Sequence, residues 1–169
     1  MKQTIRYGLV LFIVCSVASG LLAGVNAMTK DKIARQLKLE EEASLKEVMP
    51  MAARFQAVDK AGYYQAYDQK DNLIGVCFKA QGKGYSSVIE VMVGMFNDGT
   101  INAIKVLSLN ETPGLGSKVA EDDFISRFRS CKDLNQVQAI SGATISSRAV
   151  IEAVKIKSQQ IKELMKNGR

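Results

Sequence analysis

The chain has 169 residues, 47% of them hydrophobic, which suits one modest domain with its own core beside a membrane segment. Its net charge is +6, but the basic residues are spread along the chain without interleaved aromatic residues. We therefore interpret them as a solvated surface, which could lie against anionic lipid, and not as a nucleic-acid site. The sequence has no histidine and no CxxC pair among its three cysteines, which excludes histidine-based metal, haem and nucleophile sites and leaves no zinc or Fe–S motif.

An uncharged segment, residues 7–28, follows a short N-terminal tail, residues 1–6. A helix needs about 20 apolar residues to cross the hydrocarbon core of a bilayer, so the segment predicts a transmembrane anchor. The alternative is a signal peptide cleaved near Val25-Asn26-Ala27. The apolar run is longer than the roughly 7–15 residues usual in a signal peptide, which favours a retained anchor. Basic residues after the segment leave its orientation open on charge bias alone.

Residues 29–50 predict a linker helix, because apolar residues such as Leu45 and Val48 recur at helical spacing and Pro50 ends the pattern. Residues 51–169 predict a second domain. Its first apolar runs, separated by turn residues, indicate the strands Tyr63–Asp68, Leu73–Ala80, Val88–Phe96 and Thr100–Leu109. The Asp98-Gly99 pair predicts a hairpin between the last two strands, and residues 81–85 predict a loop.

The second half of this domain predicts a short helix over Glu121–Arg129, a strand over Val137–Ile140 and a long last helix after Ser141–Ser147. In the last helix, apolar residues from Val150 to Met165 share a face, with lysines opposite. The predicted fold class is therefore α+β: a single N-terminal transmembrane helix, then one domain with a mostly antiparallel sheet flanked by helices.

Two of the cysteines lie in the second domain. Cys77 falls in an apolar run, which favours a small core residue. If the domain faces an oxidising compartment, a disulfide between Cys77 and Cys131 is an open alternative.

The loop Ser141-Gly142-Ala143-Thr144 delivers the chain to the last helix. A helix N-terminus has unpaired backbone N–H groups and a partial positive charge, which together favour a phosphate. Gly142 and Ala143 let a ligand approach the backbone closely, and the Thr144 hydroxyl could be esterified to a phosphate. Either Ser146 or Ser147 could cap the helix. The alternative is a capped helix after a tight turn, with no ligand.

The loop Glu111–Gly116 is longer and stiffer than a hairpin needs. Pro113 fixes one φ angle, while Gly114 and Gly116 expose backbone N–H groups. Leu115 between the glycines could present an apolar side chain to a flat ring. The alternative is an ordinary turn at the end of a strand.

The two loops together resemble the FMN-binding domain shared by the RnfG subunit of the Rnf complex and the NqrC subunit of the Na+-translocating NADH:quinone reductase. The segment Gly82-Lys83-Gly84-Tyr85 resembles the glycine-rich segment of that family, and the N-terminal anchor also fits. The resemblance covers nearly the whole chain. The compact length favours the Rnf subunit, with the quinone-reductase subunit as the alternative.

The resemblance implies a covalent FMN, esterified through its phosphate to the hydroxyl of Thr144 by a flavin transferase. It implies that Thr112, Leu115 and Gly116 contact the flavin ring or ribityl chain, and that Lys118 stabilises negative charge. The family usually has an aspartate six residues before the modified threonine; this chain has Gln138 there, which keeps hydrogen bonding without the charge. The implied cofactor-binding residues are Thr144, Ser141, Gly142, Ala143, Ser147, Glu111, Thr112, Gly114, Leu115, Gly116, Lys118 and Tyr85, with no catalytic residue and no metal ligand.

By the same resemblance, the chain is an electron-relay subunit of an Rnf-type ferredoxin:NAD+ oxidoreductase that moves Na+ or H+ across the membrane. Its partners are the other subunits of the complex, the flavin transferase and membrane lipids. A covalently held flavin suits a domain on the extracytoplasmic side, which cannot draw on cytoplasmic FMN. The competing hypothesis from another class is a membrane-anchored scaffold module without a cofactor, in which both loops are structural.

Overall fold

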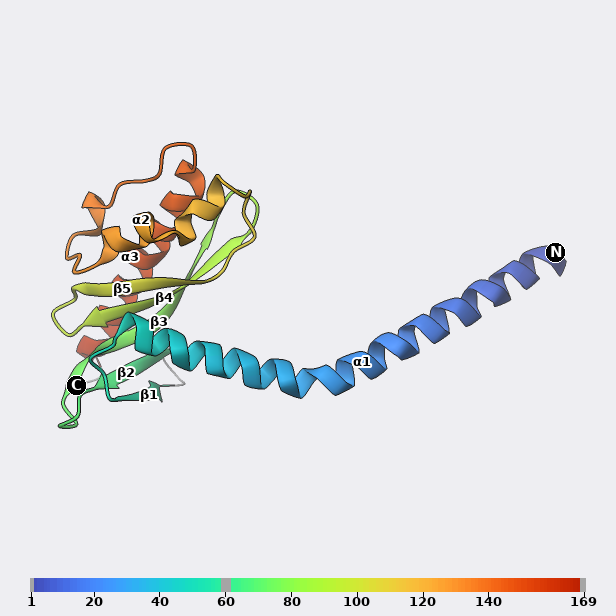
Figure 1. Ribbon diagram of the computed structural model, residues 1–169, viewed down its shortest axis with the longest axis horizontal. Coiled ribbons are helices and arrows are strands. Elements are labelled where there is room, and N and C mark those ends of the chain that lie inside the picture. The colour runs from blue at the N-terminus through green and yellow to red at the C-terminus, as the bar shows by residue number, and fades with distance from the viewer. Residues whose placement is uncertain (1, 59–61, 168–169) are drawn as a thin grey trace. The chain divides into compact units, whose positions relative to one another are not determined.

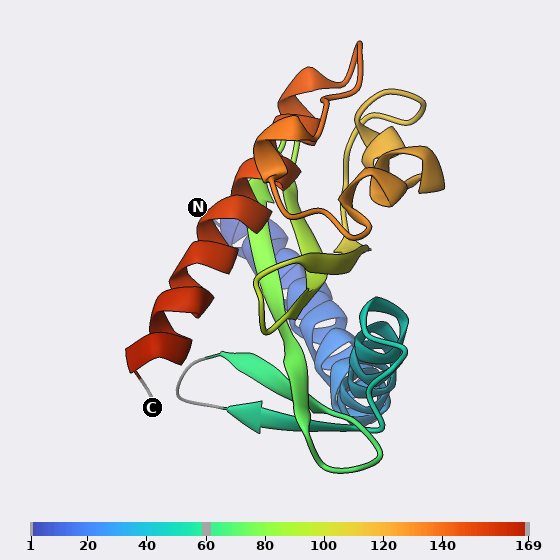
Figure 2. The same ribbon diagram turned by 90° about the vertical axis from the view of Figure 1, so that its left-hand side faces the viewer.

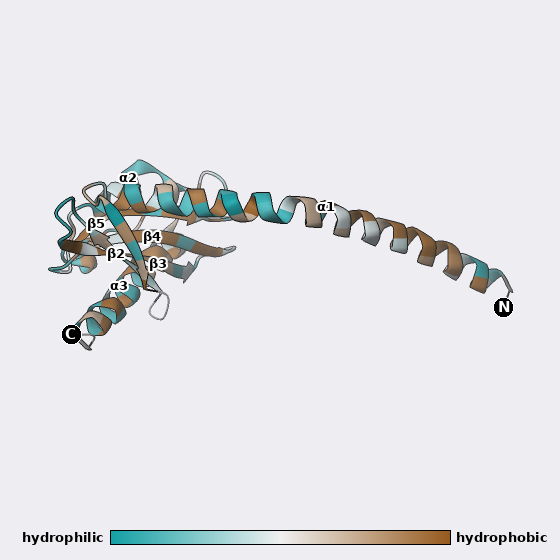
Figure 3. Ribbon diagram, turned by 90° about the horizontal axis from the view of Figure 1, so that it is seen from below, coloured by the Kyte–Doolittle hydropathy of each residue, from teal (hydrophilic) through white to brown (hydrophobic). Residues whose placement is uncertain are grey.

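The computed structural model describes residues 2–58 and 62–167. The chain divides into two compact units, Met1–Glu41 and Glu42–Arg169. Residues 2–41 belong to helix α1, Lys2–Val48. Hydrophobic residues predominate along its N-terminal half in the view of Figure 3, as expected for a helix without a wide polar face. This helix is long and apolar enough to cross a membrane.

The second unit contains a five-stranded antiparallel sheet whose strand order follows the chain (Figure 1). The prediction of an α+β fold with an antiparallel sheet is confirmed. The strands are β1 Arg54–Val58, β2 Tyr63–Tyr67, β3 Leu73–Lys83, β4 Val88–Phe96 and β5 Ile101–Ser108. Strand β1 was not predicted, because this edge strand is mostly exposed and carries a weak apolar pattern. Strand β3 also extends to Lys83, through residues 81–83 that were expected in a loop.

The predicted hairpin at Asp98-Gly99 is confirmed. Strands β4 and β5 pair antiparallel on either side of it. Gly99 has φ +87°, which a side chain would disfavour. The Asp98 carboxylate accepts hydrogen bonds from the Thr100 backbone N–H at 2.9 Å and from the Thr100 hydroxyl at 2.8 Å.

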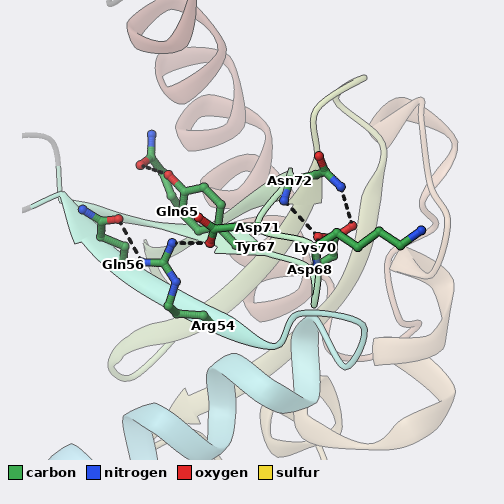
Figure 4. A network of polar contacts seen from close by, with 8 residues as sticks. All are labelled: Arg54, Gln56, Gln65, Tyr67, Asp68, Lys70, Asp71 and Asn72. Carbon is green, nitrogen blue, oxygen red and sulfur yellow. Dashed lines mark hydrogen bonds and ion pairs between the residues drawn. The ribbon is translucent and has the colours of Figure 1, made fainter.

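A polar network joins edge strand β1 to the β2–β3 turn (Figure 4). Arg54 pairs with Asp71 at 2.6 Å and stacks over the ring of Tyr67, with its guanidinium carbon 4.5 Å from the ring centre. In the turn, the Asp68 carboxylate accepts from the Asn72 backbone N–H at 2.9 Å. These contacts hold the Leu73 end of β3 in place.

The two faces of the sheet carry separate cores. On one face, helix α3, Thr144–Asn167, packs against β3 and β4 (Figure 2). Its predicted apolar face is confirmed, since Val150, Val154 and Ile161 are buried there. On the other face, the last turn of α1 contributes Leu45 and Val48 to the second core.

The positions of the cysteines rule out the disulfide between Cys77 and Cys131. Cys77 belongs to the core that contains Val48, whereas Cys131 packs against the core under α3, on the other face of the sheet. Both thiols are free. Burial raises the pKa of the Cys77 thiol to about 12, so it is a neutral core residue.

Short helical turns follow β5: η1 Gly116–Ala120, α2 Asp122–Ile125, η2 Ser126–Phe128 and η3 Leu134–Gln136. The helix expected over Glu121–Arg129 is confirmed as α2 followed by η2, with Phe124 and Phe128 buried. The strand expected over Val137–Ile140 is wrong, because that segment is irregular. Its apolar residues pack against the core, but the Ile140 N–H donates to the Ser147 hydroxyl instead of to a neighbouring strand.

Candidate functional site

Three segments that are distant in the sequence meet at one end of the sheet (Figure 1). They are the loop after β3, the loop after β5 and the first turn of α3, and they enclose a pocket of about 530 Å³. A hollow of about 620 Å³ lies elsewhere, beside Asp98 and Lys162, but its lining includes no residue of either loop motif. The pocket at the two loops is lined by Tyr85, Glu111, Thr112, Leu115, Gly116, Gly142, Ala143, Thr144, Ile145 and Ser146.

Two glycines allow the close packing that forms this pocket. A Cβ atom on Gly82 would overlap the carbonyl of Ala149, so the end of β3 contacts the backbone of α3 directly. A Cβ atom on Gly116 would lie 2.7 Å from Glu111 Oε2 and 2.8 Å from Ser146 Oγ. The absence of side chains at these positions therefore brings the three segments together.

The carboxylate of Glu111 ties the segments to one another. Oε1 accepts hydrogen bonds from the Ser86 N–H at 3.0 Å, the Ser87 N–H at 2.9 Å and the Ser87 hydroxyl at 3.2 Å. Oε2 accepts from the Ser146 hydroxyl at 2.7 Å and the Tyr85 N–H at 3.2 Å. Glu111 is only 7% exposed, so these bonds replace the water that an exposed carboxylate would bind.

These hydrogen bonds determine the charge of Glu111. Burial raises its pKa, but the hydroxyl of Ser146 and the backbone N–H groups of residues 85–87 stabilise the ionised form more strongly, and the pKa falls to about 2. Glu111 is therefore a carboxylate at neutral pH. It lines the pocket, but it directs both oxygens at protein donors.

Helix α3 begins at Thr144, which is exposed. The Ser147 N–H donates a backbone hydrogen bond of the α-helical i→i−4 kind to the Ala143 carbonyl at 2.9 Å. The N–H groups of residues 144–146 precede it and have no acceptor within the helix. Within the described part of the chain they also have no side-chain acceptor. The pocket wall therefore includes a threonine hydroxyl beside available N–H donors.

The expectation that Ser146 or Ser147 caps α3 is wrong. Both serines lie inside the first turn and not before it, so their hydroxyls bind elsewhere. The Ser146 hydroxyl donates to Glu111. The Ser147 hydroxyl donates to the Ala143 carbonyl at 2.8 Å and accepts from the Ile140 N–H at 3.1 Å. The helix N-terminus thus remains open to an external anion.

Exposed apolar side chains surround the pocket. Tyr85 is 72% exposed, Leu115 51% and Ile145 56%. We call these three residues the apolar rim. They come from the three different segments, and such side chains suit the faces of a flat aromatic ring. Ile145 was not among the residues predicted from the sequence; its place directly after Thr144 in an exposed first turn is the signal that could have found it.

The structure brings most of the implied cofactor-binding residues into the pocket wall, namely Tyr85, Glu111, Thr112, Leu115, Gly116, Gly142, Ala143 and Thr144. Four others lie outside it. Ser147 is fully buried, and the Gly114 N–H donates to the Ser117 hydroxyl at 2.9 Å within the loop. Ser141 and Lys118 are outside the lining. Contact of any of these residues with a cofactor stays a prediction.

Comparison with known proteins matches two parts of the chain to family models. Residues 1–48 match the RnfG N-terminal region, and residues 84–157 match the FMN-binding domain, which includes every residue of the pocket wall. The crystal structure of Shewanella oneidensis NqrC has a similar fold, with a TM-score of 0.51, 21% identity, and coverage of 69% of this chain and 74% of that chain.

Relatives match along almost the full chain. The G subunit of the ion-translocating oxidoreductase complex of Methanosarcina acetivorans is 31% identical over 90% of this chain and 92% of the relative. The G subunit of the Na(+)-translocating ferredoxin:NAD(+) oxidoreductase complex of Acetobacterium woodii is 29% identical over 98% and 95%. The chain belongs to the RnfG family, the G subunits of ion-translocating oxidoreductase complexes.

Proposed function

We propose that this chain carries FMN bound covalently through Thr144 and relays electrons within an Rnf-type ferredoxin:NAD+ oxidoreductase coupled to Na+ or H+ translocation. The observation that carries the proposal is the pocket in which the first turn of α3 and the apolar rim face the same space. The names of the relatives in Acetobacterium woodii and Clostridium ljungdahlii, a Na+- and a proton-translocating ferredoxin:NAD+ oxidoreductase, support the reaction class.

The phosphate of FMN fits the first turn of α3. Thr144 offers an exposed hydroxyl there, and Gly142, with φ +81°, leaves the approach to the backbone open. The N–H groups of residues 144–146 stabilise the negative charge that the phosphoester retains. Such an interaction contributes roughly 0.3–1 kcal/mol at an exposed helix end.

The ring system of FMN fits the remainder of the pocket. The volume of about 530 Å³ lies within the range of roughly 300–1,000 Å³ for small-molecule sites. Leu115 and Ile145 provide apolar surface for the ring, while Thr112 provides a hydroxyl. The covalent bond keeps the cofactor in place although the rim of the pocket is exposed to solvent.

FMN supplies the redox chemistry, since it exchanges electrons singly or in pairs. The chain binds, orients and holds it, and no side chain of the pocket needs to transfer a proton. We place the domain on the extracytoplasmic side of the membrane, with α1 as a retained anchor and a flavin transferase as the modifying enzyme. A single apolar helix without charged residues in its membrane segment provides no ion path, so the translocating subunits are separate partners.

The attachment site is tested by replacing Thr144. The full chain is expressed in membranes with a flavin transferase as wild type, Thr144→Ala and Thr112→Ala. The last is a matched control, because Thr112 is the other threonine of the pocket wall. We expect fluorescent bands on denaturing gels, and an intact mass increased by one FMN, for wild type and Thr112→Ala only. A fluorescent Thr144→Ala band would refute the attachment site, and a colourless wild-type protein would support the cofactor-free scaffold.

A further inference from the structure

The carboxylate of Glu111 is surrounded by hydrogen-bond donors. The three backbone N–H groups of residues 85–87 and the hydroxyls of Ser87 and Ser146 all donate to it. A protonated carboxyl or an amide would place a donor hydrogen among these donors. The arrangement is therefore specific for a carboxylate ion, which joins the loop after β3 to the first turn of α3.

This ion is stabilised without a cationic partner. Among residues 2–58 and 62–167, no lysine or arginine forms an ion pair with Glu111, and the largest effects on its pKa come from burial and from the hydrogen bonds of Ser146 and residues 85–87. Hydrogen bonds stabilise the negative charge without neutralising it. Glu111 is buried, so little water screens the charge, and it acts on its surroundings more strongly than a surface carboxylate does.

The charge lies in the wall of the pocket that Thr144 and Leu115 also line. A fixed anion opposes the addition of electrons to a group beside it, because reduction adds negative charge. We infer that Glu111 is a positioning residue for the flavin site and that its fixed negative charge lowers the reduction potential of the bound flavin. This inference rests on the proposed function.

The charge is tested with Glu111→Gln, in the full chain expressed with the flavin transferase. Glutamine keeps the shape of the side chain but loses the charge, and one of its two terminal atoms no longer accepts. Ser146→Ala is the matched control, since it removes one donor to Glu111 and keeps the charge. The flavin potential is measured by redox titration followed by absorbance, and the attached fraction by intact mass.

We expect a higher flavin potential for Glu111→Gln than for wild type, and a much smaller shift for Ser146→Ala. The attached fraction should fall in both variants, because both loosen the link between the loop and α3. Equal potentials for Glu111→Gln and wild type would overturn the inference. An equal shift in the two variants would also overturn it, because the shift would then follow from the loosened structure and not from the charge.

A second pair of variants serves if Glu111→Gln takes up no flavin. Ser86→Lys adds a positive charge on the residue whose backbone N–H donates to Glu111, and it retains that N–H. Gln69→Lys adds the same charge in the β2–β3 turn, at the far end of β3. We expect Ser86→Lys to raise the potential and Gln69→Lys to leave it unchanged. An unchanged potential in Ser86→Lys would overturn the inference.

The failure of this inference and that of the proposed function give different results. A wild-type chain without FMN by intact mass contradicts the proposed function. A flavin that is attached in wild type, with a potential unaffected by Glu111→Gln and Ser86→Lys, contradicts only the role of the Glu111 charge.

Discussion

Replacing Gly116 by alanine should separate the three segments of the pocket. The new Cβ atom would lie 2.7 Å from Glu111 Oε2 and 2.8 Å from Ser146 Oγ, the two atoms of a hydrogen bond that is itself 2.7 Å long. The methyl group and the hydrogen bond cannot both be accommodated without movement. The loop after β5 must therefore move away from α3, or Ser146 must release Glu111.

The expected cost follows from these contacts. A hydrogen bond to a charged group contributes about 1.5–3 kcal/mol, and an extra methyl group in a packed site costs about 1–3 kcal/mol. Alanine gives the unfolded chain fewer conformations than glycine does, and this effect alone stabilises the folded state by about 0.4–1 kcal/mol. We therefore expect Gly116→Ala to lower the free energy of unfolding by about 2–5 kcal/mol. The attached fraction of FMN should fall with it.

Gly114→Ala is the matched control in the same loop. Gly114 has φ +74°, but a Cβ atom there would meet no atom within 4 Å. Only the backbone strain of a left-handed conformation remains, about 1–2 kcal/mol. Urea unfolding of the three proteins, followed by circular dichroism, gives the comparison. A free energy of unfolding for Gly116→Ala equal to or above that of Gly114→Ala would refute the argument from close packing.

Buried side chains lead to three more predictions. Glu111 has a pKa of about 2 in the folded chain, below its ordinary 4.5. The contribution of ionised Glu111 to the stability of the fold is therefore complete above about pH 4.5 and is lost as the pH falls toward 2. As the pH is lowered, the urea midpoint should fall more steeply in wild type than in Glu111→Gln. Phe128→Ala should lower the free energy of unfolding by about 3–5 kcal/mol, because the ring is fully buried against Phe124; a loss under about 1 kcal/mol in thermal melts would contradict the packing. Cys77 and Cys131 lie on opposite faces of the sheet, so intact mass after thiol alkylation under denaturing conditions should show both modified without prior reduction.

The sequence predicted those elements whose conformation depends on residues close together in the chain. The Asp98-Gly99 hairpin depends on a turn conformation that glycine favours, and the apolar face of α3 depends on helical spacing. Strand β1 was not predicted, because its residues are mostly exposed and do not alternate between buried and exposed positions. Residues 137–140 have an apolar pattern that fits a strand, but they pair with no strand and pack against the core as an irregular segment.

The motifs of the site could be predicted from the sequence, but the contacts between them could not. Glu111 was expected at the cofactor site and lines the pocket, but its bonds to three backbone N–H groups and to the hydroxyls of Ser87 and Ser146 were not foreseen. The contact with Ser146 spans 35 positions, and no local pattern encodes it. The same reason explains Gly82, whose requirement for glycine appears only when α3 lies against β3.

The order of the strands has a consequence for when the protein can receive its cofactor. Each strand pairs with its neighbour in the chain, so the sheet can assemble hairpin by hairpin as synthesis proceeds. The pocket cannot form during these early steps, because Thr144 and Ser146 belong to α3, the last element of the chain. On the proposed attachment at Thr144, an enzyme that recognises the assembled pocket would modify only chains whose C-terminal helix has docked, and the bound flavin would mark completed folding.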